Sequence, residues 1–384
     1  MTLFSKLPHV GTTIFTVMSK LATDTGAINL SQGFPGFNCD QHLLDLVTKY
    51  MSKGFNQYAP MSGVPVLKQR LAEKTKLVYG VDYNAENEVT IVSGATEALF
   101  SAITAVVKEG DEVILLEPAY DSYAPAVILN SGTPIYIPLS LPDFSVDWEK
   151  VKSAINPKTR LIMVNTPHNP TGYVWSQKDV NMLAELIEGT DIYVVSDEVY
   201  EHISFDGRTH ISLMTHPVLK ERTFVCGSFG KTFHVTGWKI GYCLAPKKLT
   251  SEFRKVHQFV TFSTPTPLQY ALAEYLQEPD HYLSIPDFYQ KKRDLFCEGL
   301  KGTAFQFVPA QGSFFQLVSY GHLSRESDFD LAIKLTKEIG VASIPISVFF
   351  NEKTDHKILR FCFAKENAEL EKALDKLQNS KLFS

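Results

Sequence analysis

The middle of the chain alternates short, continuously apolar runs with helical patterns, and this alternation constrains the fold more than any other feature of the sequence. The runs RLIMVN at residues 160–165 and IYVVS at residues 192–196 are apolar along most of their length. Such continuous runs are typical of strands whose two faces are both covered. Because strands of this type, separated by helices, form parallel sheets, the sequence predicts an α/β protein with a doubly wound, mostly parallel sheet.

The same patterns predict the individual elements. Strands are expected at residues 89–93, 112–116, 134–138, 160–165, 192–196 and 223–228, and helices at residues 96–108 and 177–188. After Leu249, helices are expected at residues 251–260, 267–277, 286–300, 328–339 and 367–378, and strands at residues 313–318 and 357–364. This last part reads as a smaller α+β unit, so we expect two domains.

The composition of the 384 residues excludes several classes of protein. Hydrophobic residues make up 44% of the chain and charged residues 21%, as in a folded protein rather than a disordered or fibrous one. The formal net charge of −5 provides no basic surface, so neither nucleic acid nor an anionic membrane is expected as a partner. The sequence lacks both a long apolar run and the apolar segment of a signal peptide, so we expect no membrane span and no secretion.

The five cysteines are widely spaced, and no two of them form a C-x-x-C motif. Reduced thiols explain this pattern better than a disulfide framework or a zinc site. We therefore predict a cytoplasmic location.

Sequence motifs of several common enzyme classes are absent. No two glycines lie two residues apart, which excludes the dinucleotide-binding G-x-G-x-x-G motif. Neither H-E-x-x-H nor G-x-S-x-G occurs. The tripeptide Gly230-Lys231-Thr232 looks like the end of a phosphate-binding P-loop. However, Val225 stands where that motif needs glycine, and the β-like run WKIGYCLA follows where it needs a helix.

Lys231 lies just after a predicted strand, in the segment CGSFGKTFHVTGWKIGY, among small and aromatic residues. An apolar cleft disfavours the charged form of a lysine, which makes the amine a candidate nucleophile or Schiff-base former. Taken alone, a lysine that caps nearby carbonyl groups is the better interpretation. Three further clusters favour the chemical one.

Each of these clusters also lies at the end of a predicted strand. Ser93-Gly94-Ala95-Thr96 opens a helix whose N–H groups could bind a phosphate, with a plain helix cap as the alternative. The loop NTPHNPTG (165–172) gathers polar side chains where open α/β sheets bind ligands. Asp197 follows the strand IYVVS, and a carboxylate there is expected to face a cation or a metal unless it caps the next helix. A phosphate site, an amine and a partnered carboxylate together fit pyridoxal 5′-phosphate.

The ordered set of motifs resembles that of the class I and II aminotransferases of fold type I. The similarity runs from LSQGFPGF through NQYAP, SGATEA, EPAYDSY, NTPHNPTG, SDEVYEHI and SFGKTFHVTGWKIGY to LRFCFA. Within this family the chain is most similar to the branch of methionine aminotransferases and kynurenine or glutamine transaminases. The resemblance implies a large domain at residues 46–275, whose sheet is flanked by helices, and a smaller α+β domain at residues 1–45 and 276–384.

The resemblance also implies which residues hold pyridoxal 5′-phosphate. Lys231 would bind the aldehyde, Asp197 would pair with the ring nitrogen, and Tyr120 would stack on the ring. The ring 3′-oxygen would be bound by Asn169 and Tyr200, and the phosphate by Ala95, Thr96, Ser228 and Lys239. Tyr58 would reach the phosphate in a second subunit, which implies a homodimer. Two positions depart from many relatives, which carry arginine in place of Lys239 and serine in place of Gly230.

For the substrate, the resemblance implies that Arg360 binds the α-carboxylate with two parallel hydrogen bonds and that Gly33 closes over it, beside Asn169. Aromatic side chains would form the rest of the pocket, namely Phe15, Phe34, Tyr120 and Phe262, although core packing explains Phe15 and Phe262 almost as well. The segment HQFVTFSTPTP lacks the second arginine that aspartate aminotransferases recruit from this region. A neutral or aromatic amino acid is therefore expected: methionine, phenylalanine, tyrosine, kynurenine or glutamine.

The reaction implied is the transfer of an amino group to a 2-oxo acid in two ping-pong half-reactions, with Lys231 moving the α-proton. A C–S β-lyase acting on cysteine conjugates would use the same cofactor residues, so this alternative stays open. A DNA-binding regulator would need an added segment before Gly33. An inactive scaffold is opposed by the complete set of Lys231, Asp197, Asn169, Tyr200 and Arg360.

Overall fold

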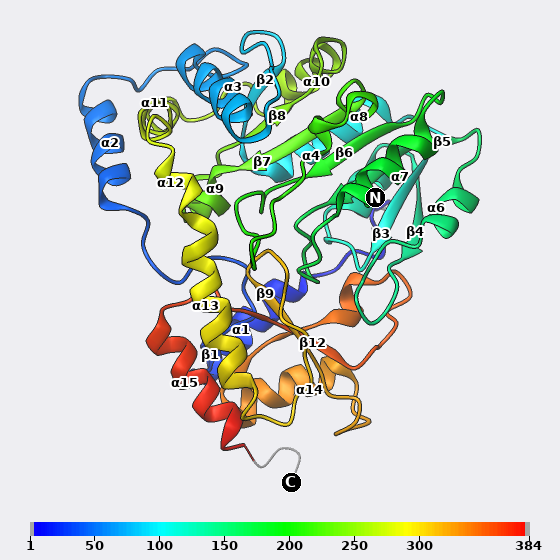
Figure 1. The fold of residues 1–384 in the computed structure, drawn as a ribbon, viewed down its shortest axis with the longest axis vertical. Coiled ribbons are helices and arrows are strands. Elements are labelled where there is room, and N and C mark those ends of the chain that lie inside the picture. Colours follow the sequence, from blue (N-terminus) through cyan, green and yellow to red (C-terminus); the bar gives the residue numbers. More distant parts are fainter. Residues whose placement is uncertain (1–3, 381–384) are drawn as a thin grey trace.

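The computed structural model describes residues 4–380, and its largest element is a seven-stranded sheet in the upper half of Figure 1. The strand order is β2-β8-β7-β6-β5-β3-β4, and only β8 runs antiparallel to its neighbours. The strands are β2 (Val89–Val92), β3 (Glu112–Glu117), β4 (Thr133–Pro138), β5 (Thr159–Asn165), β6 (Tyr193–Asp197), β7 (Thr223–Ser228) and β8 (Gly241–Leu244). The predicted α/β fold with a mostly parallel sheet is therefore confirmed.

Continuous apolar runs form the middle of this sheet because successive residues are buried on opposite faces. In β5, Ile162 joins an apolar cluster that contains Leu183 of α7 (Gln177–Ile187), whereas the next residue, Met163, joins a cluster that contains Leu99 of α4 (Gly94–Val106). The neighbouring strands β3 and β6 divide their residues between the same two clusters. Because helices cover both faces of the sheet, these strands are apolar along their length and do not alternate between apolar and polar residues.

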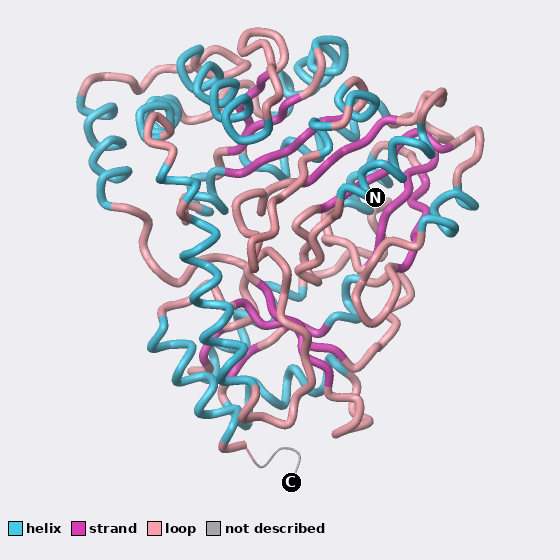
Figure 2. Tube along the Cα trace, in the orientation of Figure 1, coloured by secondary structure: helices cyan, strands magenta, loops and turns pink. Residues whose placement is uncertain are grey.

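Further helices surround the sheet (Figure 2), and several of them were not predicted from the sequence. The helix predicted at residues 251–260 begins earlier, as α10, and the one predicted at residues 267–277 is α11. The bounds are α2 (Gln41–Ser52), α3 (Pro65–Tyr79), α5 (Tyr123–Leu129), α6 (Trp148–Ala154), η1 (Leu213–Thr215), α8 (Pro217–Lys220), α9 (Phe229–Thr232), η2 (Thr236–Trp238), α10 (Lys247–Val260), α11 (Thr266–Tyr275) and α12 (Asp280–Leu283).

The lower part of the molecule in Figure 1 combines α1 and β1, which lie near the start of the chain, with the C-terminal part of the chain from α13 onward. A three-stranded antiparallel sheet, β11-β12-β9, packs with helices around one apolar cluster that includes Met18, Leu30 and Phe361. The N-terminal segment joins it through a parallel pair of β1 and β10. The elements are α1 (Ile14–Thr25), β1 (Ile28–Asn29), α13 (Ile285–Leu300), β9 (Phe315–Ser319), α14 (Asp328–Lys334), η3 (Leu335–Ile339), β10 (Val341–Ala342), β11 (Ile344–Pro345), η4 (Ile346–Phe349), β12 (Ile358–Cys362) and α15 (Asn367–Gln378).

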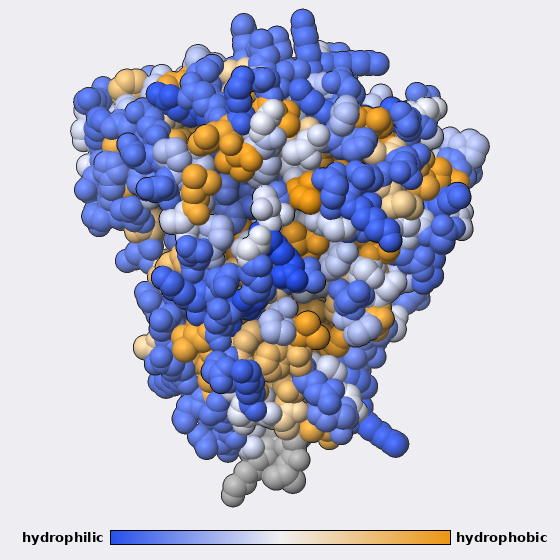
Figure 3. Space-filling view, in the orientation of Figure 1, coloured by the Kyte–Doolittle hydropathy of each residue, from blue (hydrophilic) through white to orange (hydrophobic). Residues whose placement is uncertain are grey.

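The helix predicted at residues 328–339 is α14 followed by the π-helical turn η3, while the closing helix α15 has the predicted bounds. The proposed domain limits at residues 46–275, and 1–45 with 276–384, stay a prediction. Figure 3 shows one face of the molecule, on which hydrophilic residues dominate and apolar residues are scattered. Among residues 4–380, none of the helices combines the length and the apolar composition that crossing a bilayer requires.

We expect Gly227→Ala to destabilise the fold. Tyr242, opposite Gly227 on β8, lays its ring across this position, so an added Cβ would lie 2.1 Å from Tyr242 Cζ. Overpacking of this kind costs about 1–3 kcal/mol. Urea unfolding should show a lower midpoint for this variant, whereas Gly11→Ala, whose Cβ would meet nothing within 4 Å, should leave it unchanged. An unchanged midpoint for Gly227→Ala would contradict this packing.

Candidate active site

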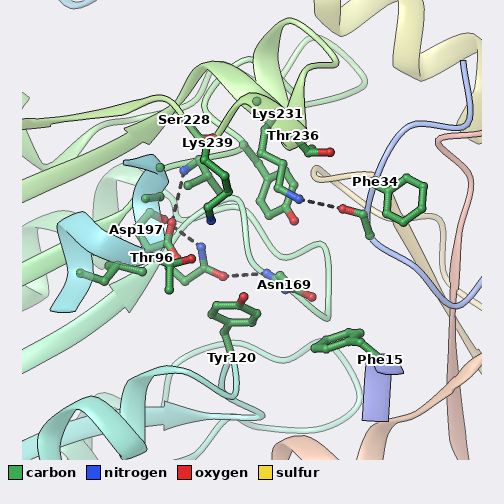
Figure 4. Close-up of a pocket in the computed structure, with 18 of the residues that line it drawn as sticks. Phe15, Phe34, Thr96, Tyr120, Asn169, Asp197, Ser228, Lys231, Thr236 and Lys239 are labelled. Atoms are coloured by element: carbon green, nitrogen blue, oxygen red, sulfur yellow. Dashed lines mark hydrogen bonds between the residues drawn. The ribbon is translucent and has the colours of Figure 1, made fainter. Parts of the chain in front are cut away.

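A cavity of about 290 Å³ lies between the carboxyl ends of the large-sheet strands and the lower part of the molecule (Figure 4). It is lined by Phe15, Gln32, Gly33, Phe34, Gly94, Ala95, Thr96, Leu99, Tyr120, Asn165, Asn169, Asp197, Val199, Tyr200, Ser228, Gly230, Lys231, Thr236, Lys239, Ile240, Phe315 and Arg360. Every residue that the sequence placed in the site is among them, except Tyr58 and Phe262.

The parallel sheet brings several of these side chains together. Asn165, Asp197 and Ser228 are the last residues of β5, β6 and β7, which lie side by side. Parallel strands end at one edge of their sheet, and α4 begins at the same edge after β2. The cavity therefore occupies the place where open α/β sheets bind ligands.

Lys231 lies in the short helix α9 that follows β7, and its side chain is partly buried. Its Nζ donates a hydrogen bond of 2.7 Å to the carbonyl oxygen of Gly33 (Figure 4). Burial is the main reason that the pKa of Lys231 falls to about 8. A lysine with this pKa is partly neutral near neutral pH, which is the form that acts as a nucleophile or a base.

Asp197 is also buried, and its pKa is shifted upward, whereas that of Lys231 is shifted downward. Its Oδ2 accepts a hydrogen bond of 2.7 Å from Tyr123 Oη, and its Oδ1 accepts one of 3.4 Å from the Val199 N–H. Burial raises the pKa of Asp197 to about 6, against the opposing effect of the Tyr123 hydrogen bond. Such a carboxylate can share a proton with a nitrogen base in the cavity. Tyr123 was missed by the sequence reasoning, although it ends the motif EPAYDSY.

A chain of hydrogen bonds connects Asp197 to Arg360. Asn165 Nδ2 donates to the carbonyl oxygen of Asp197 at 2.8 Å, and Asn165 Oδ1 accepts from the Asn169 N–H at 2.8 Å. Asn169 Oδ1 in turn accepts from Arg360 Nη1 at 2.7 Å. The two asparagines therefore link the sheet edge to strand β12 of the lower part.

Arg360 is fully buried, and burial lowers its pKa to about 10. Its Nη2 donates to the carbonyl oxygen of Ser31 at 2.9 Å, its guanidinium lies 3.9 Å from the ring centre of Phe315, and its Nε has no hydrogen-bond partner. A buried guanidinium at the wall of a cavity suits a carboxylate ligand. Phe315 was not identified from the sequence either, because it lies on β9 and contacts Arg360 on the neighbouring strand β12.

The first turn of α4 brings a lysine close to the backbone N–H groups of a helix N-terminus. Gly94 has a φ of +73°, and a Cβ at this position would lie 3.2 Å from Lys239 Nζ. The glycine therefore lets the Lys239 ammonium approach the backbone N–H groups at the start of a 13-residue helix. An ammonium, free helix N–H groups and the nearby Ser228 hydroxyl suit a phosphate. By contrast, residues 4–380 contain no group of three or more His, Cys, Asp or Glu side chains placed to hold a metal ion.

Tyr58 and Phe262 lie outside this cavity, next to each other on the surface. Their ring centres are 5.4 Å apart, and the two residues are 83% and 50% exposed. Phe259, on the same α10–α11 segment as Phe262, is also exposed. Within one chain neither ring can contact a ligand in the cavity, so the roles predicted for them require a second copy of the chain.

Comparison with known proteins supports the same chemistry. The family model of the aminotransferases of class I and II matches residues 25–377. A methionine aminotransferase of Escherichia coli strain K12 is 48% identical over 375 residues, which cover 97% of each chain. A kynurenine–oxoglutarate transaminase of Dictyostelium discoideum is 35% identical over 407 residues, covering 96% of this chain and 94% of that one.

The fold agrees with these sequence similarities. The crystal structure of YbdL from Escherichia coli, for which a methionine aminotransferase function was identified, superposes with a TM-score of 0.97 at 48% identity. The match covers 99% of this chain and 100% of that one.

The raised pKa of Asp197 predicts that this residue destabilises the protein as the pH rises. Folding moves its pKa from 3.8 to about 6, so its contribution to stability is complete below pH 3.8 and is lost as the pH rises through 6. We expect the free energy of unfolding of Asp197→Asn, relative to that of the wild type, to increase by up to about 3 kcal/mol as the pH rises from below 3.8 to above 6. Urea midpoints of ligand-stripped protein at pH 4.5 and 7.5 would measure this. A difference between the two proteins that does not change with pH would contradict the shift.

Proposed function

The chain belongs to the aminotransferases of class I and II, and from this premise we propose that it moves the α-amino group of a neutral or aromatic L-amino acid, methionine above all, to a 2-oxo acid. The observation that carries the proposal is Arg360, the one guanidinium among the described residues that line the cavity. It donates to an amide and a carbonyl oxygen rather than to a carboxylate, and it stands beside aromatic rings. Such a site suits one carboxylate and an apolar side chain.

The residues of the cavity fit pyridoxal 5′-phosphate. The N-terminal turn of α4, with Ala95 and Thr96, together with Ser228 and Lys239, would hold the phosphate in the cradle that Gly94 leaves open. The ring would lie beside Tyr120, with its nitrogen toward Asp197 and its 3′-oxygen toward Asn169 and Tyr200. When bound, the cofactor supplies an aldehyde that takes the amino group and a conjugated ring that accepts electrons from Cα.

The chain itself would bind the substrate and move its protons. Arg360, with Gly33 and Asn169 beside it, would hold the α-carboxylate and so orient the Cα–H bond. The neutral amine of Lys231 would take the proton from Cα of the donor amino acid and, in the second half-reaction, would return a proton to Cα of the acceptor. A pKa of about 8 leaves part of Lys231 neutral near neutral pH, which allows this role. Asp197 would hold a proton at the ring nitrogen, in a two-half-reaction cycle in which donor and 2-oxo acid bind in turn.

Aromatic residues favour methionine as the donor. Phe15, Phe34, Tyr120 and Phe315 line the cavity, and a thioether makes favourable contacts with aromatic rings. The high identity to a methionine aminotransferase supports this choice. The relatives of this chain are named for transamination, so the C–S β-lyase alternative is not favoured.

A homodimer would complete the site. Tyr58 would reach the phosphate of the second subunit, and Phe262 would add to the wall of its substrate pocket. The exposure of both rings in a single chain supports this arrangement, because large aromatic side chains on a surface mark interaction sites.

Incubation of the purified enzyme with methionine and a 2-oxo acid tests the proposed function. With these substrates we expect 4-methylthio-2-oxobutanoate and the amino acid formed from the acceptor. In a separate incubation with a cysteine conjugate, we expect no release of pyruvate or ammonia. Aspartate, whose second carboxylate lacks a guanidinium here, should react poorly. Preferential release of pyruvate and ammonia from a cysteine conjugate would favour the lyase instead.

Lys231→Ala should abolish turnover, because Lys239, the other amine among the described residues that line the cavity, lies at the first turn of α4 and would hold the phosphate. A general base alone contributes about 10²–10⁴-fold, and the loss of the covalent cofactor link adds to this. Single-turnover absorbance and the kcat for methionine measure the effect. Lys20→Ala, on an exposed helix face, is the control. Retained turnover together with an unchanged cofactor spectrum would show that the nucleophile is wrongly assigned.

Arg360→Ala should raise the KM of methionine, phenylalanine and alanine by the same factor, because it removes the contact with their shared carboxylate. The loss of two charge-assisted hydrogen bonds predicts about 10²–10³-fold. Steady-state kinetics with the three donors would check this. A selective loss for one side chain would assign Arg360 to another part of the substrate.

A further inference from the structure

Three residues of the segment 31–37 line the cavity, namely Gln32, Gly33 and Phe34. Hydrogen bonds connect this segment to β12 and to the residues that follow β12. Arg360 Nη2 donates to the carbonyl oxygen of Ser31 at 2.9 Å, and the Gly36 N–H donates to that of Ala364 at 2.8 Å. The segment therefore runs along the strand that carries Arg360 and continues beside the residues at the end of that strand.

Lys365 makes the most unusual contact with this segment. Only 3% of its surface is exposed, yet no carboxylate among residues 4–380 lies within ion-pair distance of its ammonium. Its Nζ instead donates to the carbonyl oxygen of Phe34 at 3.1 Å and lies 4.6 Å from the centre of the Phe34 ring. A buried charge is costly unless it is compensated, and here a carbonyl group and an aromatic face compensate it.

The backbone is shaped for this approach. A Cβ added at Gly36 would lie 3.0 Å from Cδ of Lys365, closer than ordinary van der Waals contact. A second lysine repeats the arrangement three residues further along. Lys292 Nζ lies 4.9 Å from the ring centre of Phe37 and donates to the carbonyl oxygen of Lys365 at 2.8 Å. Phe37 is not among the residues that line the cavity, whereas Phe34 is.

The Phe34 ring lies at the edge of the cavity, beside the carbonyl group that Lys231 reaches (Figure 4). Phe34 is 44% exposed, so apolar packing alone leaves its ring free to turn toward solvent. The contact with Lys365 holds both the carbonyl group and the ring of this residue. Lys365 itself does not line the cavity and can act on a substrate only through Phe34.

We propose that Lys365 is a positioning residue for substrate specificity, which holds Phe34 as an aromatic wall against the side chain of the amino acid. It selects long apolar side chains over short ones, because only a long side chain reaches the ring. The inference rests on the proposed function and deepens it.

Lys365→Met in the holoenzyme removes the charge and keeps the length of the side chain. We expect the KM of methionine and phenylalanine to rise about 3- to 10-fold, the range of a partly buried cation–π contact, while the KM of alanine and all three kcat values stay unchanged. Lys365→Arg should restore most of the selectivity. Equal KM changes for all three donors, or no change at all, would overturn the proposal.

Lys220→Met is the matched control, because Lys220 Nζ lies 5.2 Å from the ring centre of Tyr83 and donates to the carbonyl oxygen of Asp82 at 3.0 Å, and neither Lys220 nor Tyr83 lines the cavity. This control should lower the melting temperature and leave the ratio of the KM for methionine to the KM for alanine unchanged. Should Lys365→Met fail to fold, Lys365→Gln removes the charge, keeps a polar group for the buried carbonyl oxygen of Phe34 and tests the same contact. It should give the same selective loss for long side chains, and unchanged selectivity would count against Lys365.

A double-mutant cycle connects the effect to Phe34. Phe34→Leu should lose the same selectivity, and adding Lys365→Met to it should cause little further loss; additive losses would refute the proposal. Calorimetric binding of 4-(methylthio)butanoate and propanoate, which carry no amino group, separates this proposal from the proposed function. Selective weakening of the longer ligand in Lys365→Met supports the role of Lys365 even if methionine proves not to be a substrate.

Discussion

The burial of unlike charges around one cavity is the constraint on which the rest of the site depends. Removal from water raises the pKa of Asp197 and lowers that of Lys231, so both groups titrate close to neutral pH. Neither shift would survive in an open groove, where water would restore the usual values. The fold therefore has to seal the cavity, and it does so by closing the sheet edge with residues 31–37 and β12 of the lower part.

The two halves of the molecule contribute different chemistry to this cavity. The large sheet supplies the amine, the acid and the phosphate cradle from strand ends and from the start of α4, which are rigid and closely spaced. The lower part supplies Arg360, Phe315 and the aromatic segment around Phe34. In the proposed function, the residues that would hold the cofactor are thus mostly separate from those that would select the substrate, and the Asn165–Asn169 hydrogen bonds connect the two sets.

Within residues 4–380, several buried cations near the substrate side of the cavity form no ion pair with a carboxylate. Arg360 stacks on Phe315, Lys365 lies over Phe34, and Lys292 lies over Phe37. Aromatic faces and carbonyl oxygens stabilise these charges without neutralising them. Of these cations, Arg360 lines the cavity and stays positive there, which suits a substrate carboxylate, while Phe315 and Phe34 make the wall apolar enough for a hydrophobic side chain.

Local patterns of a few residues were enough to predict the parallel strands, the closing helix and the placement of Lys231, Asp197 and Asn169 near strand ends. The helices α2 and α3 were not predicted. The antiparallel course of β8 and the partners Tyr123, Ser31 and Phe315 could not be predicted, because they depend on contacts between distant segments. Tyr123 meets an acid 74 positions away, and Arg360 meets a carbonyl group 329 positions away. Which distant residues become neighbours depends on how whole layers pack, and a local pattern carries no record of that.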